Sequence, residues 1–228
     1  MQKKGSTFFN IIIIITAIAL LGIGGYAAYY YINNAVAVKE AEDAVEEFEK
    51  NVIVVAIENE KPKQENQPAV AGNDDQDEED DQPSSGSGSG SRSYSTTYRG
   101  YNMVGTMQIP RTKIKVPIVD VVTINSIAAA VGVLYGPGPN EIGNTVYAAH
   151  NYRNGTFFSN NKQLDIGDNI YITDCNGHTV EYTITNVYET DANDFEYATR
   201  NTFGKREISL TTCTPNPNIR LIVWAAES

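Results

Sequence analysis

The sequence of 228 residues predicts an all-β domain, a closed β-barrel of seven or eight strands with short helices, preceded by a transmembrane helix and a disordered tether. Three observations predict this arrangement. An apolar stretch without charged residues lies near the N-terminus, an acidic and Gly/Ser-rich segment follows it, and short segments of alternating apolar and polar residues fill the C-terminal part.

The apolar stretch, residues 8–32, is long enough to cross a bilayer, which takes about 20 apolar residues. Lys3 and Lys4 precede it, so residues 1–7 are predicted to be cytoplasmic and the rest of this single-pass cell-membrane protein extracellular. Three tyrosines at positions 29–31 favour an uncleaved anchor, because aromatic rings prefer the headgroup level. The alternative is a cleaved signal peptide, with Ala-Val-Ala at 35–37 as its cleavage site.

Two further segments connect this helix to the folded domain. Residues 33–60 carry apolar side chains spaced by three and four, which predicts an amphipathic helix standing on the membrane. Residues 61–93 contain the acidic run 74–81 and a Gly/Ser repeat, and this composition predicts a disordered linker. We interpret the acidic run as a solvated spacer rather than a site for a basic partner, so the net charge of -11 says little about the active surface.

The folded domain is predicted to occupy residues 94–228. Asn176-Gly177 is a strong hairpin signal between two alternating segments. A short alanine-rich helical turn is expected at 125–132, and no concentrated basic stripe suggests a nucleic-acid site. Strands are expected at 103–110, 113–119, 144–151, 169–173, 179–185, 207–213 and 220–224.

Three reactive residue types stand at the ends of these strands. Cys213 closes one strand, Arg220 opens the next, and His150 ends a third. A free thiol with a pKa of about 8.5 becomes an effective nucleophile when a nearby cation favours the thiolate. The three residues therefore provide what cysteine-dependent acyl transfer requires.

The second cysteine and second histidine offer alternatives. Cys175 and His178 bracket the Asn-Gly turn, where they are expected to face each other. A catalytic dyad there would lack a pocket and oxyanion donors, and a zinc site would need three or four ligands. A disulfide between Cys175 and Cys213 would silence the nucleophile in an oxidising compartment.

Four motifs together resemble the sortase family. Gly105-Thr-Met-Gln-Ile-Pro110 resembles its opening strands, Ala149-His150-Asn151 its histidine motif and Leu210-Thr-Thr-Cys213 its cysteine motif, and Arg220 falls where the family arginine belongs. The membrane anchor and tether also resemble the family layout. The resemblance implies a transpeptidase that cuts a sorting signal, LPxTG-like by default, in secreted proteins. It implies transfer of the new carboxyl end to an amine of cell-wall peptide or of a pilin.

The resemblance also implies roles for individual residues. Cys213 would attack the scissile carbonyl to form a thioacyl enzyme, and His150 would protonate the departing amine. Arg220 would stabilise the oxyanion or position the peptide. Thr212 and Asn151 are expected to contact the substrate.

The class within the family follows from two short segments. Only six residues separate Cys213 from Arg220, a shorter loop than class C sortases usually carry, and a lid motif is not obvious. The helical insertion typical of class B is missing before the cysteine strand. A class D-like or unclassified small sortase is favoured.

We expect no cofactor and no required metal. Some sortases are activated by calcium through acidic loops, and one such loop is present here, but its usual partner loop offers only Glu141. The acidic residues of the loop before the last strands are Glu189, Asp191, Asp194 and Glu196.

A second function class remains open on the sequence alone. The chain could be a catalytically silent, membrane-tethered β-barrel that binds sorting-signal peptides or wall material. An inert descendant is expected to have lost Cys213 or Arg220, and this chain keeps both together with His150.

Overall fold

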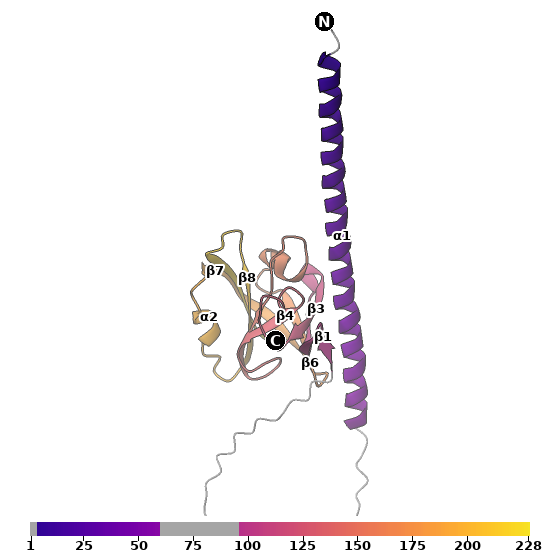
Figure 1. Ribbon diagram of the computed structural model, residues 1–228. Helices are drawn as coiled ribbons and strands as arrows, with labels where there is room; N and C mark the ends of the chain where they lie inside the picture. The colour runs from indigo at the N-terminus through magenta and orange to yellow at the C-terminus, as the bar shows by residue number, and fades with distance from the viewer. Residues whose placement is uncertain (1–3, 60–95) are drawn as a thin grey trace, which may run out of the picture.

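The computed structural model describes residues 4–59 and 96–228. The predicted linker at 61–93 lies outside the described residues. Figure 1 shows the two described parts, a long helix and a β-barrel that lies against it.

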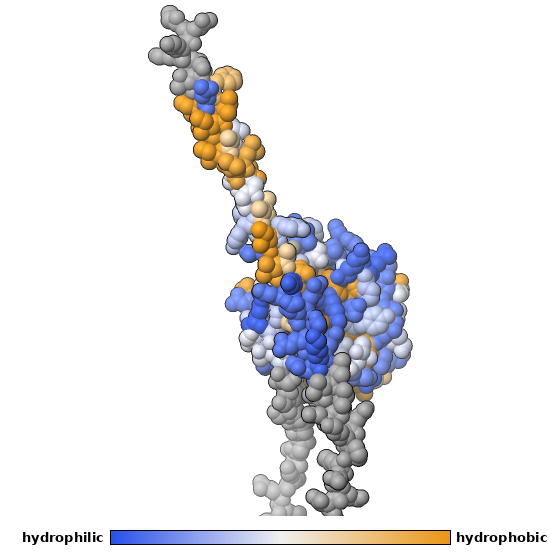
Figure 2. Space-filling model, turned by 90° about the vertical axis from the view of Figure 1, so that its right-hand side faces the viewer, coloured by the Kyte–Doolittle hydropathy of each residue, from blue (hydrophilic) through white to orange (hydrophobic). Residues whose placement is uncertain are grey.

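The N-terminal part is one continuous helix, α1 (Lys4–Asn59). Two helical segments were predicted, at 8–32 and 33–60, and they form one helix because no proline or glycine occurs between Tyr26 and Asn59 to end it. The span Phe9–Asn51 contains a window long and apolar enough to cross a membrane. Figure 2 shows the apolar part of α1 projecting beyond the barrel.

The C-terminal part is a closed barrel of eight strands. The sheet runs in the order β1-β2-β3-β4-β5-β8-β9-β7-β6, and β6 also pairs with β2, which closes it. The short β1 pairs only with the start of β2 and lies outside the closed circuit. The closed β-barrel fold with short helices is therefore confirmed. The strands are β1 (Thr97–Tyr98), β2 (Tyr101–Ile109), β3 (Ile114–Val119), β4 (Val131–Tyr135), β5 (Gly143–Ala148), β6 (Asn169–Asp174), β7 (Thr179–Asp191), β8 (Arg206–Cys213) and β9 (Ile219–Glu227).

Three short helices interrupt the strands. The 3-10 turn η1 (Pro110–Thr112) joins β2 to β3, and η2 (Phe157–Gln163) follows the segment after β5. The single turn α2 (Glu196–Thr199) lies between β7 and β8.

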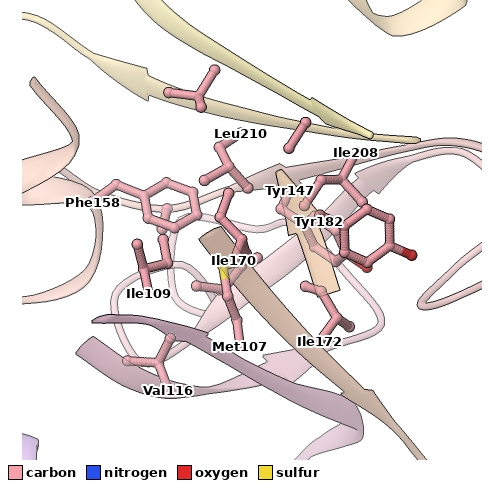
Figure 3. Close-up of a cluster of buried hydrophobic side chains, with 14 of the residues drawn as sticks. Met107, Ile109, Val116, Tyr147, Phe158, Ile170, Ile172, Tyr182, Ile208 and Leu210 are labelled. Carbon is pink, nitrogen blue, oxygen red and sulfur yellow. The ribbon is translucent and has the colours of Figure 1, made fainter. Parts of the chain in front are cut away.

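Apolar side chains fill the inside of the barrel because successive residues of a strand point to opposite faces. In β8, Ile208 and Leu210 belong to the interior cluster, whereas Ser209 between them bonds to Asn144 outside that cluster. Figure 3 shows this interior cluster. Its labelled members are Met107, Ile109, Val116, Tyr147, Phe158, Ile170, Ile172, Tyr182, Ile208 and Leu210.

Helix α1 packs against the outside of the barrel. Ala41, Val45 and Phe48 form its buried stripe, and Phe48 is only 1% exposed. This stripe packs against Tyr98, Met103, Val119, Ala129 and Ala130 of the barrel domain. Two ion pairs flank it, one between Glu40 and Arg99 and one between Glu49 and Lys115.

Each predicted strand is present, with most ends within three residues of the expected position, so that β5 ends at Ala148 and His150 follows it; the larger differences concern β4, β7 and β1. β4 was not predicted, because its first two residues fall within the alanine-rich turn expected at 125–132. β7 continues to Asp191, six residues further than expected, and β1 was not predicted. At the hairpin, the last paired residues are Thr173 and Thr179, so Cys175 and His178 lie in the loop and do not form a cross-strand pair. Cys175 instead packs against the cluster between α1 and the barrel.

Candidate active site

The strand pairing brings Cys213, His150 and Arg220 to one end of the barrel. β5 and β8 are parallel, with Ala148 opposite Thr211, so His150 and Cys213 each follow two residues later at the same end. β8 and β9 are antiparallel, and Cys213 is the direct partner of Arg220. Side chains of directly opposed residues lie on the same face of a sheet, about 5 Å apart at Cβ.

The candidate site lies on the outer face of the sheet. Leu210 and Val223 point into the barrel interior, so the alternation places Cys213 and Arg220 on the opposite face. Cys213 is exposed and free, and Arg220 is half-buried. A thiol at this position is open to a ligand, whereas a thiol on the inner face would be buried in the core.

Two hydrogen bonds join the chain after β5 to the end of β8. The Thr212 hydroxyl donates to the Ala149 carbonyl oxygen at 2.8 Å, and the Asn151 side-chain amide donates to the Cys213 carbonyl oxygen at 2.9 Å. These bonds continue beyond the last ladder pair of β5 and β8. The first fixes the residue before His150 to the residue before Cys213, and the second fixes the residue after His150 to Cys213 itself.

The two bonds bear on the expected substrate contacts. Thr212 is 4% exposed, and its hydroxyl hydrogen is already donated to the backbone. Asn151 is half-buried, and its side-chain oxygen accepts a bond from the Arg153 backbone amide at 3.2 Å. Both side chains therefore hold the local backbone, beside any contact with substrate.

The His150 ring is half-buried and has an aromatic neighbour. Its centroid lies 4.9 Å from that of the Tyr152 ring, and the two planes are inclined by 40°. Burial lowers the pKa of His150 below its ordinary value, which favours the neutral imidazole. The His150 carbonyl oxygen accepts a bond from the Phe158 backbone amide at 3.2 Å, which holds the following loop in place.

Arg220 keeps its charge available at the strand end. One terminal nitrogen of its guanidinium donates to the Pro217 carbonyl oxygen at 2.8 Å and to the Ile219 carbonyl oxygen at 3.2 Å. Within residues 4–59 and 96–228, Arg220 forms no ion pair. An uncompensated guanidinium beside the thiol can favour the thiolate or bind an oxyanion.

A polar cluster outside the barrel supports the cysteine strand. The Asn144 amide donates to the Tyr197 and Ala198 carbonyl oxygens at 2.9 and 3.1 Å. The Arg200 guanidinium lies 4.7 Å from the centroid of the Trp224 ring and forms an ion pair with Glu207. These contacts connect α2 to β5, β8 and β9 and so hold the strands that carry the site.

The second cysteine lies away from this site. β6 runs opposite to β8, so the loop after β6, which contains Cys175, lies at the other end of the barrel. No disulfide joins Cys175 and Cys213.

The acidic loop makes local bonds. Asp194 accepts a bond from the Thr190 hydroxyl, which together with the Glu196 backbone amide lowers the pKa of the Asp194 carboxyl. Asp191 accepts two bonds from Asn193. In the part of the chain that the structure describes, no group of three or more His, Cys, Asp or Glu side chains could hold a metal. Independence from calcium stays a prediction, which a calcium titration of turnover would check.

One residue of the site was missed in the sequence. Tyr152 is 41% exposed and lies between the His150 ring and the Phe157 ring, whose centroid is 6.1 Å away. An aromatic residue two positions after a candidate catalytic histidine was the available signal. Only the turn of the chain after Asn151 shows that this ring covers the imidazole.

The comparisons with known proteins assign the family. The sequence model of the sortase domain matches residues 107–228, more than half of the chain. The chain therefore belongs to the sortase family, whose members are cysteine transpeptidases. A comparison with curated proteins found no match.

Solved sortases of several classes share the fold. A Clostridium perfringens sortase D5 transpeptidase is 25% identical, with a TM-score of 0.51, and the match covers 56% of this chain and 79% of that one. Corynebacterium diphtheriae sortase A is also 25% identical, with a TM-score of 0.51 over 56% of this chain and 61% of that one. Streptococcus agalactiae sortase C1, in complex with MTSET, is 24% identical, with a TM-score of 0.51 over 55% and 69% of the two chains. These similar values leave the class open.

Proposed function

We propose that this sortase is a membrane-anchored cysteine transpeptidase that cleaves a C-terminal, LPxTG-like sorting signal of secreted proteins. It would join the new carboxyl end to an amine of cell-wall peptide or of a pilin. Cys213, His150 and Arg220 are its catalytic residues in this proposal. The observation that carries it is the register of β5, β8 and β9. In this register Cys213 is the direct partner of Arg220, and it lies at the same end of the barrel as the segment that bears His150.

The reaction takes place in two halves. The Cys213 thiolate attacks the scissile carbonyl carbon, the carbon–nitrogen bond breaks, and protonated His150 gives its proton to the departing amine. An acceptor amine then attacks the thioester, the carbon–sulfur bond breaks, and neutral His150 takes the proton of the amine. Arg220 stabilises the negative oxygen that forms in each half.

The supporting residues have defined parts in this scheme. Thr212 and Asn151 hold the two strand ends together through their bonds to Ala149 and Cys213, and any contact they make with substrate adds to that role. The lowered pKa of His150 suits the second half, in which a neutral imidazole accepts a proton.

The anchoring is the second part of the proposal. Basic residues before the apolar part of α1 favour a cytoplasmic N-terminus, which leaves the barrel outside the cell. An uncleaved helix agrees with the position of Tyr29 and Tyr30, which precede the alternative cleavage site at 35–37 and line a pocket together with Tyr152 of the barrel domain.

The test uses the full chain in detergent or lipid nanodiscs. Wild type is incubated with a panel of quenched LPxTG-type peptides and an amine acceptor, and both enzyme and products are measured by mass spectrometry. We expect a thioacyl adduct on Cys213 and an amine-ligated product, both absent in Cys213→Ala and retained in the matched control Cys175→Ala. If no peptide reacts and a thiol-reactive probe also fails to label Cys213, the silent binding barrel becomes the better description.

A further inference from the structure

The candidate site lies at the end of the barrel from which the apolar part of α1 projects. β5 and β8 both end there, whereas the loop after β6 lies at the far end. In Figure 1 the apolar part of α1 leaves the barrel at one end, and the label of β6 lies toward the other.

A pocket of about 450 Å³ connects α1 to the loop next to His150. Tyr29 and Tyr30 line it from the helix, and Tyr152 and Phe157 line it from the loop. Tyr152 is also the ring that packs against His150, in a tilted arrangement. Tyr152 therefore lies next to His150 and also lines the pocket that the interfacial tyrosines line from the helix.

The helix contacts the barrel along much of its length, which sets the direction in which the barrel faces. The residues of α1 that face the barrel run from Tyr29, which lines the pocket, to Glu49, which forms an ion pair with Lys115, a span of about 30 Å at a rise of about 1.5 Å per residue. Between these ends lie the buried Val45 and the ion pair of Glu40. Contacts so far apart along the helix oppose a swing of the barrel away from α1.

We propose that α1 holds the catalytic end of the barrel at the surface of the bilayer, on the side of the membrane where the barrel lies. The partner is the lipid headgroup layer. The arguments are the tyrosines at 29–31, which belong at headgroup level, and the shared pocket that brings the loop of Tyr152 to the same level. The inference rests on the proposed function only in calling this end of the barrel catalytic.

A barrel that is separated from α1 would place the candidate site at a measurably different distance from the tyrosines. If the barrel separated from α1, its remaining connection to the helix would begin at Asn59, about 44 Å along the helix from Tyr30. The candidate site would then no longer be held at the level of the tyrosines.

The experiment measures how close each end of the barrel comes to the lipid headgroups. A fluorophore is attached to Cys213 in a Cys175→Ser chain, or at the far end in Asn176→Cys with Cys175→Ser and Cys213→Ser. Each full chain is placed in vesicles of phosphatidylcholine and phosphatidylglycerol containing a headgroup-nitroxide lipid, which quenches only nearby fluorophores. We expect strong quenching at Cys213 and weak quenching at position 176.

Helix docking is then broken with Phe48→Asp, which puts a charge into the buried stripe. Quenching at Cys213 is expected to fall to the level found at position 176. Glu49→Lys, which removes the ion pair with Lys115, should act in the same direction, whereas the matched change Glu47→Lys at an exposed position should leave quenching unchanged. Far-ultraviolet circular dichroism verifies that the barrel remains folded.

Two results would overturn the inference. Equal quenching at both ends in the wild-type chain would show that the catalytic end does not face the lipid. Unchanged quenching at Cys213 in a folded Phe48→Asp chain would show that α1 does not hold it there. Neither result depends on catalysis, so an active enzyme with equal quenching would keep the proposed function and lose only this inference.

Discussion

At the scale of single residues, the candidate site depends on uncharged hydrogen bonds as much as on its three reactive groups. Cys213 ends β8 and His150 follows β5, and the regular pairing of these two strands ends at Ala148 and Thr211. Beyond that point, the side chains of Thr212 and Asn151 replace the missing ladder bonds. The sequence motifs identified both positions, but their bonds to backbone oxygens could not be predicted because the acceptors are 62 or 63 residues away in the chain.

Substitution of Thr212 tests this support. Thr212→Val keeps the shape of the side chain but leaves the Ala149 carbonyl oxygen without its donor. A buried group that loses its partner costs about 1–3 kcal/mol, so we expect lower stability in urea unfolding together with lower turnover. Thr212→Ser keeps the hydroxyl and should stay closer to wild type. Equal effects of the two changes would argue against a role for the hydroxyl.

The burial of His150 leads to a prediction about its titration. Because burial lowers its pKa, the folded protein keeps the imidazole neutral at a pH where the unfolded chain has begun to protonate it. Its contribution to stability is therefore lost as the pH falls below the ordinary value of 6.5 toward the folded pKa. Stability therefore decreases with falling pH in this range, as expected for a histidine that is preferentially neutral in the native state.

Nuclear magnetic resonance can observe this titration directly, because the chain contains only two histidines. We expect the His150 ring signals, assigned with His178→Gln, to titrate below the ordinary range. Tyr152→Ala uncovers the ring and should raise the His150 midpoint, whereas Tyr152→Phe should leave it nearly unchanged. A midpoint unaffected by Tyr152→Ala would mean that other groups bury the imidazole.

At the scale of elements, alternation in the sequence was enough to predict most strands. β2, β3, β6, β8 and β9 all carry an apolar face that lines the barrel. β4 could not be predicted, because it is short and its second residue, Gly132, has no side chain to show a pattern. The glycine is required at this position by close packing, because a Cβ at Gly132 would lie 2.8 Å from the Val121 carbonyl oxygen.

Gly132 connects β4, which was not predicted, to the candidate site through strand pairing. It pairs with Ala148, two residues before His150, so a shift of β4 would move the end of β5. We expect Gly132→Ala to destabilise the fold by about 1–3 kcal/mol, as overpacking does, and to lower turnover. Gly24→Ala, where nothing lies within 4 Å, should be neutral. Thermal unfolding and peptide turnover check both variants.

At the scale of the whole molecule, the sequence indicated each part but not how the parts meet. The apolar spacing of α1 predicted an amphipathic helix, and Val45 and Phe48 are indeed buried. Their partners, Tyr98, Met103 and Val119, belong to strands of a domain that the sequence analysis treated as separate. Contact between the two parts depends on packing between distant segments, which no local pattern records.

This packing predicts how turnover depends on the distance of a substrate from the membrane. If α1 holds the catalytic end at the headgroups, a lipid-anchored peptide should be cleaved fastest when its scissile bond lies only a few residues from the anchor. Release of the barrel by Phe48→Asp would leave it connected to the helix only beyond Asn59, about 44 Å from Tyr30, a distance that an extended spacer of roughly 13 residues would cover. The optimum spacer should therefore lengthen in Phe48→Asp and stay unchanged in Glu47→Lys, as measured by product formation on vesicles with a series of spacers. A free peptide should be cleaved at similar rates by both variants, because docking changes the position of the site and leaves its chemistry intact.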